Sequence, residues 1–584
     1  MASSPEGRVI MFMGRLLTFV ALAVSLAACG ARNDAPIADT VLTNGRIYTV
    51  ESDTPWVSAV AIKDGVYIAL GDDEAMQKHI GKSTQVIDLN GRMAMPGIND
   101  AHSHPFSGAI KELYECSFPF SAAPDEIVAK LRDCVAANPT SAWITGGQWD
   151  SDFFKNHHIA SPRSLLDSVS GDKAVFFADD SGHNGWANSK ALALAGITKQ
   201  TPDPANGKIG RDPKTGEPNG ILLEDAVTLL EAVIPERTSA EYVTAARQVV
   251  SIANALGITG MKDANAKPPA MAALQTLDKA GELSMYMAAA ISTPYGHREV
   301  ALDYAALEAA RTQYASPHVL TDFVKIFMDG VPTASRTAAM LAPYTPDAHG
   351  HAGDGVLHVP QEQLSADLIE LDRRGFTVKI HTAGDRSVRV ALNAIAAARE
   401  ANGNSGLRHE LAHAGYVDDA DMKRFVTLNT VADVSPVIWH PSPIITSVIN
   451  AVGRPRGEHY WPIRQFLDDG TEVAAGSDWP SAVTSPTPWT GIEAFVTRRD
   501  PDGKTPGALW PEQAITLEEA IRIYTLNGAR ALKLEHKTGS VKVGKSADLI
   551  VLDRNLFDVP IDAVGDAKVL TTFFAGSIVY RTQP

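Results

Sequence analysis

A regular alternation of short apolar runs with helical stretches constrains the fold of this chain more than any other feature. The runs are rich in β-branched and small apolar residues, and residues 387–401 and 418–428 between them carry apolar side chains at helical spacing. Strands that alternate with helices form parallel βαβ units. We therefore predict an α/β fold built on a (β/α)8 TIM barrel. Its expected strands are the segment that enters His102 and residues 257–263, 284–291, 323–329, 376–381, 407–413, 430–435 and 473–478.

Several of these runs end in a polar residue or enclose one. His102 and His104 form a His-x-His pair, and residues two apart in a strand share one face, so both imidazoles can enter one pocket. Lys325 lies inside an apolar run, where an unpaired ammonium is costly to bury. The C-terminal strand ends of a barrel carry its chemistry. The candidate metal ligands are therefore His102, His104, Lys325, His381, His413 and Asp478.

Each candidate also has a structural alternative. Lys325 can be a buried salt-bridge partner, His381 and His413 can be hydrogen-bonded core residues, and Asp478 can cap a helix. His409 lies four residues before His413 and competes with it for the sixth strand. The order in which six such residues follow successive strands favours the metal site.

These residues, together with several longer phrases, carry a resemblance to the metal-dependent amidohydrolase superfamily, and specifically to its N-substituted formamide deformylase-like branch. The resemblance covers nearly everything after residue 40. One departure is Ala412, which stands where relatives commonly carry an acidic residue, while Glu410 lies two residues earlier. The phrases are Gly182-His183 with Trp186 and Asn188-Ser189, Asp329-Gly330 with Ser335 to Ala338, Gly384-Asp385, and Thr497 to Gly503.

The resemblance implies one or two divalent ions, with zinc as the expected metal, and a carbamate on Lys325 that bridges two of them. It implies that Asp478 is catalytic, holding the attacking water and carrying its proton to the leaving nitrogen. The expected reaction is hydrolysis of the C–N bond of a small-molecule amide, such as an N-formyl or N-acyl amine. Two alternatives remain: an ester, lactone or phosphoester hydrolase with the same site, and a non-catalytic, lipid-anchored binding or regulatory protein.

A long insertion follows the first expected barrel strand. Residues from about 106 to 235 exceed the usual barrel connection, and we expect them to form a lid over the pocket. His183 and Trp149 in this insertion are candidate substrate contacts, although aromatic residues there are more often packed inside. Asp329 and Asp385, from the phrases above, are further candidate substrate contacts.

The two ends of the chain differ from the middle. The resemblance implies that residues 41–94 and 535–584, which read as short strands, form one small β-sandwich beside the barrel domain of residues 95–534. Residues 1–28 fit a lipoprotein signal peptide, because arginines precede an apolar run and Leu26-Ala27-Ala28-Cys29 resembles a bacterial lipobox. We expect lipidation of Cys29, a tether over residues 29–40, and a periplasm-facing lipoprotein. Gly30 in place of aspartate favours the outer membrane.

The cysteine content bears on a possible disulfide, and the net charge bears on which molecules the protein binds. With Cys29 lipidated, Cys116 and Cys134 remain as a pair that can form a disulfide in an oxidising compartment or stay as two buried thiols. The formal net charge of −16 argues against nucleic acid as a partner. We expect a small-molecule amide as substrate and contact with a membrane only through the lipid anchor; the oligomeric state stays open, a homo-oligomer included.

Overall fold

The computed structural model describes residues 35–119, 122–150, 153–179, 182–205, 207–346, 350 and 352–582. The chain divides into two compact units, Met1–Pro36 and Ile37–Pro584. The expected signal peptide, Cys29 and residues 29–34 of the expected tether lie outside the described residues. Within the described part, no helix combines the length and apolar character needed to cross a membrane.

An eight-stranded sheet forms the centre of the second unit, and each predicted barrel segment supplies one strand. Neighbours in the sheet follow the order of the chain and pair in parallel. This arrangement confirms the TIM barrel. The strands are β8 (Ile98–Ser103), β15 (Ile258–Ala266), β16 (Tyr286–Ser292), β17 (Val319–Phe327), β18 (Thr377–Thr382), β19 (His409–His413), β20 (Thr430–Val434) and β21 (Val473–Ala475).

The first and last strands of this sheet meet just beyond β21. The backbone N–H of Asp478 donates to the carbonyl of His102 at 2.8 Å, and the Ser477 N–H donates to the Asp100 carboxylate at 3.1 Å. Gly476 permits this approach, since a Cβ there would lie 2.3 Å from the backbone nitrogen of His102. The barrel is therefore brought together at the point where two of the candidate ligands lie.

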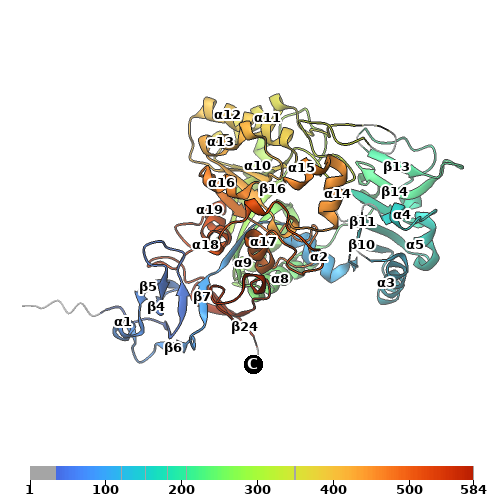
Figure 1. The fold of residues 1–584 in the computed structure, drawn as a ribbon. Coiled ribbons are helices and arrows are strands. Elements are labelled where there is room, and N and C mark those ends of the chain that lie inside the picture. The colour runs from blue at the N-terminus through green and yellow to red at the C-terminus, as the bar shows by residue number, and fades with distance from the viewer. Residues whose placement is uncertain are drawn as a thin grey trace, which may run out of the picture. The chain divides into compact units, whose positions relative to one another are not determined.

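Helices follow the strands and cover the outside of the barrel (Figure 1). The predicted helical stretch at 387–401 lies within α12, and the stretch at 418–428 extends one residue beyond α13 at each end. In α12, apolar side chains at helical spacing are buried, among them Val388, Ala391 and Ile395. The helices are α8 (Ser239–Ala255), α9 (Pro268–Lys279), α10 (Tyr304–Tyr314), α11 (Gln361–Arg373), α12 (Asp385–Asn402), α13 (Asp419–Thr427), α14 (Pro443–Val452), α15 (Arg454–Glu458), α16 (Ile463–Asp468), α17 (Pro488–Thr497), α18 (Leu517–Arg522) and α19 (Gly528–Ala531).

Both ends of the second unit build two further sheets that share a core. Strand β7, which leads into the barrel, pairs antiparallel with β22 from the C-terminal segment. Leu42, Ile62, Leu549 and Phe573 belong to one buried cluster that joins the sheets, as expected for a sandwich. The sheets are β5-β4-β1-β6 and β24-β23-β22-β7-β2-β3. Their strands are β1 (Thr40–Thr43), β2 (Arg46–Tyr48), β3 (Trp56–Val57), β4 (Ala59–Lys63), β5 (Val66–Gly71), β6 (Gln85–Asp88), β7 (Met93–Pro96), β22 (Leu549–Leu552), β23 (Val569–Phe574) and β24 (Ser577–Arg581), with α1 (Asp73–Met76) beside them.

The insertion after β8 and α2 (Pro105–Tyr114) folds around a six-stranded sheet of its own, in the order β13-β14-β12-β11-β10-β9. Figure 1 shows its strands gathered with α3, α4 and α5. A disulfide joins Cys116 in β9 to Cys134 in α3. The elements are β9 (Cys116–Ser117), α3 (Pro124–Ala137), β10 (Trp143–Trp149), α4 (Phe153–Asn156), α5 (Pro162–Ser170), β11 (Ala174–Asp179), β12 (Asn184–Ala187), α6 (Ser189–Leu194), β13 (Gly207–Arg211), β14 (Pro218–Glu224) and α7 (Thr228–Glu231).

Candidate metal centre

The six predicted ligands gather at the C-terminal end of the barrel strands. A cavity of about 200 Å³ is lined by five of them, and His102 is fully buried beside it. The ring centroids of His102 and His413 lie 5.0 Å apart, and those of His381 and His413 lie 4.7 Å apart. The residues that line the cavity are His104, Lys325, His381, His413 and Asp478.

Three of these side chains direct ligand atoms at one point. One such atom each from His102, His104 and Asp478 lies within 4.8 Å of the others. The Asp478 Oδ1 is 3.3 Å from His104 Nε2 and 3.6 Å from His102 Nε2. His102 Nε2 is buried and has no hydrogen-bond partner among the described residues. A buried nitrogen without a partner, facing a carboxylate and a second imidazole, fits a divalent metal ion.

The electrostatics of the centre favour neutral imidazoles. Burial, with the nearby charges of Lys379 and Lys325, lowers the pKa of His102 well below its ordinary value. Burial also lowers the pKa of His413 well below that value. Although burial disfavours the charge of Asp478, the hydrogen bond from His104 and the charges around it lower the pKa of that carboxyl. Neutral imidazoles and an ionised carboxylate are the states in which these groups bind metals.

Lys325 differs from the other buried lysines of the barrel. It is 1% exposed and, within the described ranges, has no carboxylate within ion-pair distance. Its Nζ lies 4.8 Å from the ring centroid of Phe327. Burial and repulsion from Lys379 lower the pKa of Lys325 to about 7. The alternative of a salt-bridge lysine is therefore not what the structure places here.

His413 reaches the cavity through an unusual backbone conformation. In β19, Glu410 points into the barrel towards Lys262 and Lys379, while Leu411 packs into the core outside it. Strict alternation would then turn residue 413 outwards. A φ of 72° at His413 breaks the alternation and brings its imidazole to the cavity. Asp478 likewise has a positive φ of 54°.

His409, the rival for the sixth strand, lies at the other end of β19. Its Nδ1 accepts from the N–H of Val378 at 3.1 Å, so its Nε2 carries the proton and donates to Asp372 at 3.1 Å. It lies four positions before His413 in the strand, a distance of about 13 Å. The structure thus places His413, and not His409, at the candidate centre.

A layer of buried charges lies beneath the ligands, and sequence reasoning missed it. The Nδ1–H of His102 donates to Asp433 at 2.7 Å, and Asp433 forms an ion pair with Lys379. Lys379 also contacts Glu410 at 2.7 Å, and Glu410 pairs with Lys262. The signal was present, because Lys262, Lys379 and Asp433 each interrupt an apolar run as Lys325 does. Glu410, the acidic residue two positions before Ala412, belongs to this layer.

Asp329 serves His381 more than it serves a substrate. It lines the cavity, yet its Oδ1 accepts from His381 Nδ1 at 2.9 Å and its Oδ2 accepts from Ser387 Oγ at 2.7 Å. The backbone N–H groups of Ala339, Ala383 and Gly384 also donate to this carboxylate. With both oxygens engaged, Asp329 orients His381, while its role as a substrate contact stays a prediction.

Of the other predicted substrate contacts, the structure brings only His183 to the cavity. Its Nδ1 lies 3.0 Å from Glu224 and 2.9 Å from the hydroxyl of Tyr295. Trp149 is 2% exposed and donates its indole N–H to the Phe177 carbonyl, so it packs inside the insertion. Asp385 begins α12 and accepts the N–H of Leu341 at 2.7 Å, outside the lining of the cavity. The structure thus does not bring Trp149 or Asp385 to this cavity.

The rest of the cavity wall is mainly apolar. Trp461 stacks on Tyr460 with ring centroids 3.6 Å apart and donates its indole N–H to the His413 carbonyl at 2.8 Å. Buried Arg498, from the phrase 497–503, donates to the Tyr460 carbonyl at 2.8 Å and thereby holds this wall. A larger chamber of about 920 Å³ shares His183 and Phe327 with the cavity. The apolar lining consists of Phe327, Val331, Pro332, Ala383, Ile438, Ile444, Tyr460, Trp461 and Ala482.

The sequence profile of the Amidohydrolase family matches residues 85–580. The chain belongs to the amidohydrolase family. This amidohydrolase is 28% identical over 553 residues to the protein LONG AFTER FAR-RED 3 of Arabidopsis thaliana, with 93% of this chain and 92% of that protein covered. It is 26% identical over 558 residues to the N-substituted formamide deformylase of Arthrobacter pascens, with 93% and 98% covered. A solved structure, an uncharacterized metal-dependent hydrolase from Pyrococcus horikoshii OT3, matches with a TM-score of 0.70 at 24% identity, covering 89% of this chain and 99% of that one.

The family assignment confirms the resemblance to the amidohydrolase superfamily and its formamide deformylase-like branch. Together with the convergence of His102, His104 and Asp478, it makes this amidohydrolase a metal-dependent hydrolase.

Proposed function

We propose that this protein is a zinc-dependent amidohydrolase that cleaves the C–N bond of a small amide, in particular an N-formyl or N-acyl amine. The observation that carries the proposal is the convergence of His102, His104 and Asp478 at a cavity with an apolar wall. Nitrogen and carboxylate ligands suit zinc. The Arthrobacter relative, whose name specifies an N-substituted formamide, supports the choice of bond.

A divalent ion held by these residues would supply an activated water and polarise the substrate carbonyl. Asp478 accepts the proton that the attacking water loses, because burial is outweighed by neighbouring groups that lower its pKa and keep it ionised. The water oxygen bonds to the carbonyl carbon, the C–N bond breaks, and Asp478 delivers its proton to the departing nitrogen. The products are a carboxylic acid and an amine.

A proton carrier so close to the reacting atoms favours amides over esters. An amine leaves poorly without a proton on its nitrogen, whereas an alkoxide makes a weaker demand. The cavity of about 200 Å³ accommodates the scissile group and small substituents, and the larger chamber beyond His183 and Phe327 leaves room for the rest of the substrate. We place the reacting carbonyl near Asp478 and an apolar substituent against Tyr460 and Trp461.

We further propose that Lys325 carries a carbamate. The support is an amine that is buried, lacks an ion-pair partner in the described part of the chain, and has a pKa lowered to about 7. A neutral amine attacks carbon dioxide, a new N–C bond forms and one proton is released. The resulting anion suits a bridge between two metal ions, which would then also engage His381 and His413.

We propose a periplasm-facing location at the bacterial outer membrane, with a lipid on Cys29 as the anchor, and a small-molecule amide as the substrate. The support is the lipobox-like tetrapeptide 26–29 and the apolar run before it. Replacement of Cys29 by serine should move the protein from the membrane fraction to the soluble fraction. Retention in the membrane would contradict the anchor.

The test of the reaction uses protein that begins after Cys29, with metal content measured by elemental analysis. We expect about two zinc equivalents and hydrolysis of N-formylbenzylamine that a chelator removes and zinc with bicarbonate restores. Benzyl formate, which has the same acyl group and an oxygen leaving group, is the matched substrate. Faster turnover of the ester, with none of the amide, would contradict amide specificity.

Two variants sharpen this test. Asp478→Asn should lower kcat for the amide by a factor of about 10² to 10⁴, because the proton carrier is lost. Glu458→Gln makes the same change from a carboxylate to an amide, in an exposed ion pair with Arg454, and should leave kcat unchanged. Full activity of Asp478→Asn would refute the mechanism.

A further inference from the structure

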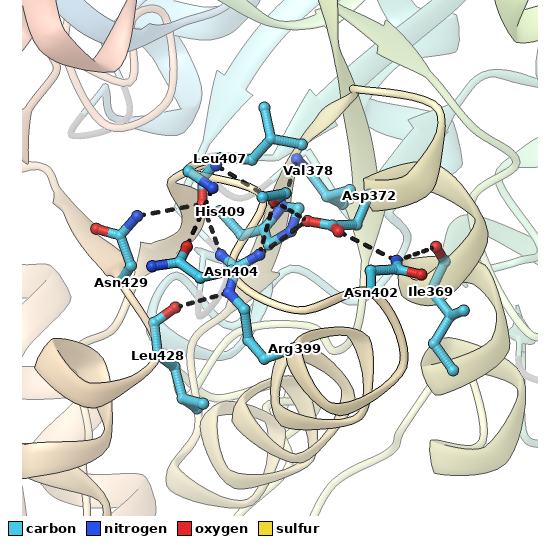
Figure 2. A network of polar contacts seen from close by, with 12 residues as sticks. Ile369, Asp372, Val378, Arg399, Asn402, Asn404, Leu407, His409, Leu428 and Asn429 are labelled. Atoms are coloured by element: carbon cyan, nitrogen blue, oxygen red, sulfur yellow. Dashed lines mark hydrogen bonds and ion pairs between the residues drawn. The ribbon is translucent and has the colours of Figure 1, made fainter. Parts of the chain in front are cut away.

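Two histidines at opposite ends of the barrel each donate to a buried carboxylate. His102 donates to Asp433 at 2.7 Å beside the metal centre. His409 donates to Asp372 at 3.1 Å at the N-terminal end of β19. Figure 2 shows the second pair, with Asp372 also held by Arg399 and Asn402. The two pairs have similar chemistry but different surroundings, and this difference assigns them different roles.

Asp433 joins the metal centre to the charge layer through a single oxygen. Its Oδ2 accepts from His102 Nδ1 and also contacts the ammonium of Lys379. Its Oδ1 has no hydrogen-bond partner among the described residues. Asp433 and Lys379 are 1% and 0% exposed, so bulk water does not reach either charge. The Lys379 ammonium is therefore what compensates the carboxylate beside His102.

The hydrogen bond from His102 decides which nitrogen faces the metal. A carboxylate only accepts hydrogen bonds, so the proton of the neutral imidazole lies on Nδ1 and the lone pair lies on Nε2. Nε2 is the atom that lies 3.6 Å from Asp478 and has no partner in the described residues. Outer partners of this kind fix the orientation of a ligating histidine and raise its affinity for the metal.

We propose that Lys379 is a positioning residue of the metal centre: it holds the Asp433 carboxylate beneath His102, and Asp433 in turn presents the Nε2 lone pair of His102 to the ion. The inference rests on the metal site of the proposed function. Lys379 does not line the cavity, so its hydrogen-bonded connection to His102 runs through Asp433. Without the ammonium, a buried carboxylate with one free oxygen has an uncompensated charge and moves away from this geometry.

The remainder of the charge layer explains why Lys379 itself keeps its place. Glu410 also contacts Lys379, at 2.7 Å, and pairs with Lys262. Lys262 also donates to the Ala531 carbonyl at 2.7 Å. The two lysines and two carboxylates balance in charge, and all are at most 1% exposed. Lys379 is thus held by two carboxylates, those of Asp433 and Glu410.

The experiment measures zinc affinity by competition with a chromophoric chelator, on the protein that begins after Cys29. The variants are Lys379→Met and Asp433→Asn, which remove one charge each and preserve size. The matched control is Asp372→Asn, which alters the second histidine–carboxylate pair of the same barrel far from the ligands. We expect zinc to bind about 10- to 100-fold more weakly to the first two variants, and within about threefold of wild type to the control.

A merely structural role is separated by two further readouts. Urea unfolding should show that Asp372→Asn loses stability as the other variants do, and the visible spectrum of cobalt-substituted protein should change only for Lys379→Met and Asp433→Asn. The double variant combines Lys379→Met with Asp433→Asn. It should bind zinc no more weakly than whichever single variant binds zinc more weakly, because Lys379 acts through Asp433. Additive losses would overturn the inference.

The failures of the two proposals give different results. If wild-type protein binds zinc and both test variants bind it equally well, the positioning role is refuted while the metal site stands. If wild-type protein binds no zinc, both are refuted. If Lys379→Met does not fold, the comparison of Asp433→Asn with Asp372→Asn decides. The inference is overturned if these two variants bind zinc with the same affinity, whether that affinity equals that of wild type or is reduced.

Discussion

Replacement of Asp372 by alanine should destabilise the barrel by about 4 kcal/mol, through two losses that partly overlap. Asp372 is fully buried and accepts from Arg399 at 2.8 Å, Ser405 at 2.7 Å, and both His409 and Asn402 at 3.1 Å. Arg399 and Asn402 keep other acceptors, on the carbonyls of Leu407 and Ile369.

Ser405 is exposed, and its hydroxyl donates to water instead, so the loss falls on the two remaining groups. The Arg399 guanidinium, 11% exposed, loses its compensating charge, and breaking a buried ion pair by removing one partner costs about 3–5 kcal/mol. The Nε2–H of fully buried His409 loses its acceptor, which costs about 1–3 kcal/mol. The two costs overlap because one cavity and its water can relieve both, so about 4 kcal/mol is the expected total.

Urea unfolding followed by tryptophan fluorescence and far-ultraviolet circular dichroism measures this loss, and agreement of the two signals checks that one transition is seen. Glu458→Ala, from a pair whose side chains are 45% and 75% exposed, is the control and should cost less than about 1 kcal/mol. A cost below about 1 kcal/mol for Asp372→Ala would refute the reasoning, because the network would then contribute no more than a surface pair.

Three further predictions concern stability and substrate binding. Burial lowers the pKa of His409 below its ordinary value of 6.5, so the unfolded chain takes up a proton near that pH while the folded chain does not, and the free energy of unfolding falls as the pH falls. His409→Gln lacks this proton uptake and should lose less stability than wild type between a pH of about 7.5 and about 5.5. An equal dependence of the free energy of unfolding on pH in urea titrations of both proteins would contradict this. Trp149→Phe should keep kcat/KM for the amide while losing about 1 kcal/mol through its missing hydrogen bond to Phe177; a large rise in KM would restore Trp149 as a substrate contact. Replacing Cys116 and Cys134 by serine opens a loop with a sequence separation of 18, and the insertion should lose about 3 kcal/mol in differential scanning calorimetry, with an unchanged scan contradicting the expected contribution.

The order of the barrel strands could be predicted because each strand is a short apolar run between helical stretches, and the candidate ligands were chosen because polar residues end those runs or lie inside them. The structure confirms all eight strands, although β21 is only three residues long. The insertion was expected as a lid, and its sheet was not foreseen because strands such as β9 and β12 are too short for a clear period. Its role as a lid stays a prediction.

The site shows where sequence patterns stop. The inward turn of His413 depends on a positive φ that no spacing encodes, and the alternation of β19 taken alone would point it outwards. Trp149 and Asp385 do not line the cavity, because a residue near a motif can serve the packing of its own segment. Asp433 and Lys379 were missed because a charge partner is recognised only when strands distant in the sequence are brought together.

Metal binding should hold together the first and last strands of the barrel, β8 and β21, which meet along a line that we call the seam. His102 belongs to the first strand of the sheet and Asp478 follows the last, and the Asp478 N–H to His102 carbonyl bond crosses the seam. An ion gripped by both side chains would act as a staple between the two ends of the barrel. Chelation should therefore speed amide hydrogen exchange at Asp478 and its neighbours more than at β17 or β18 on the opposite wall.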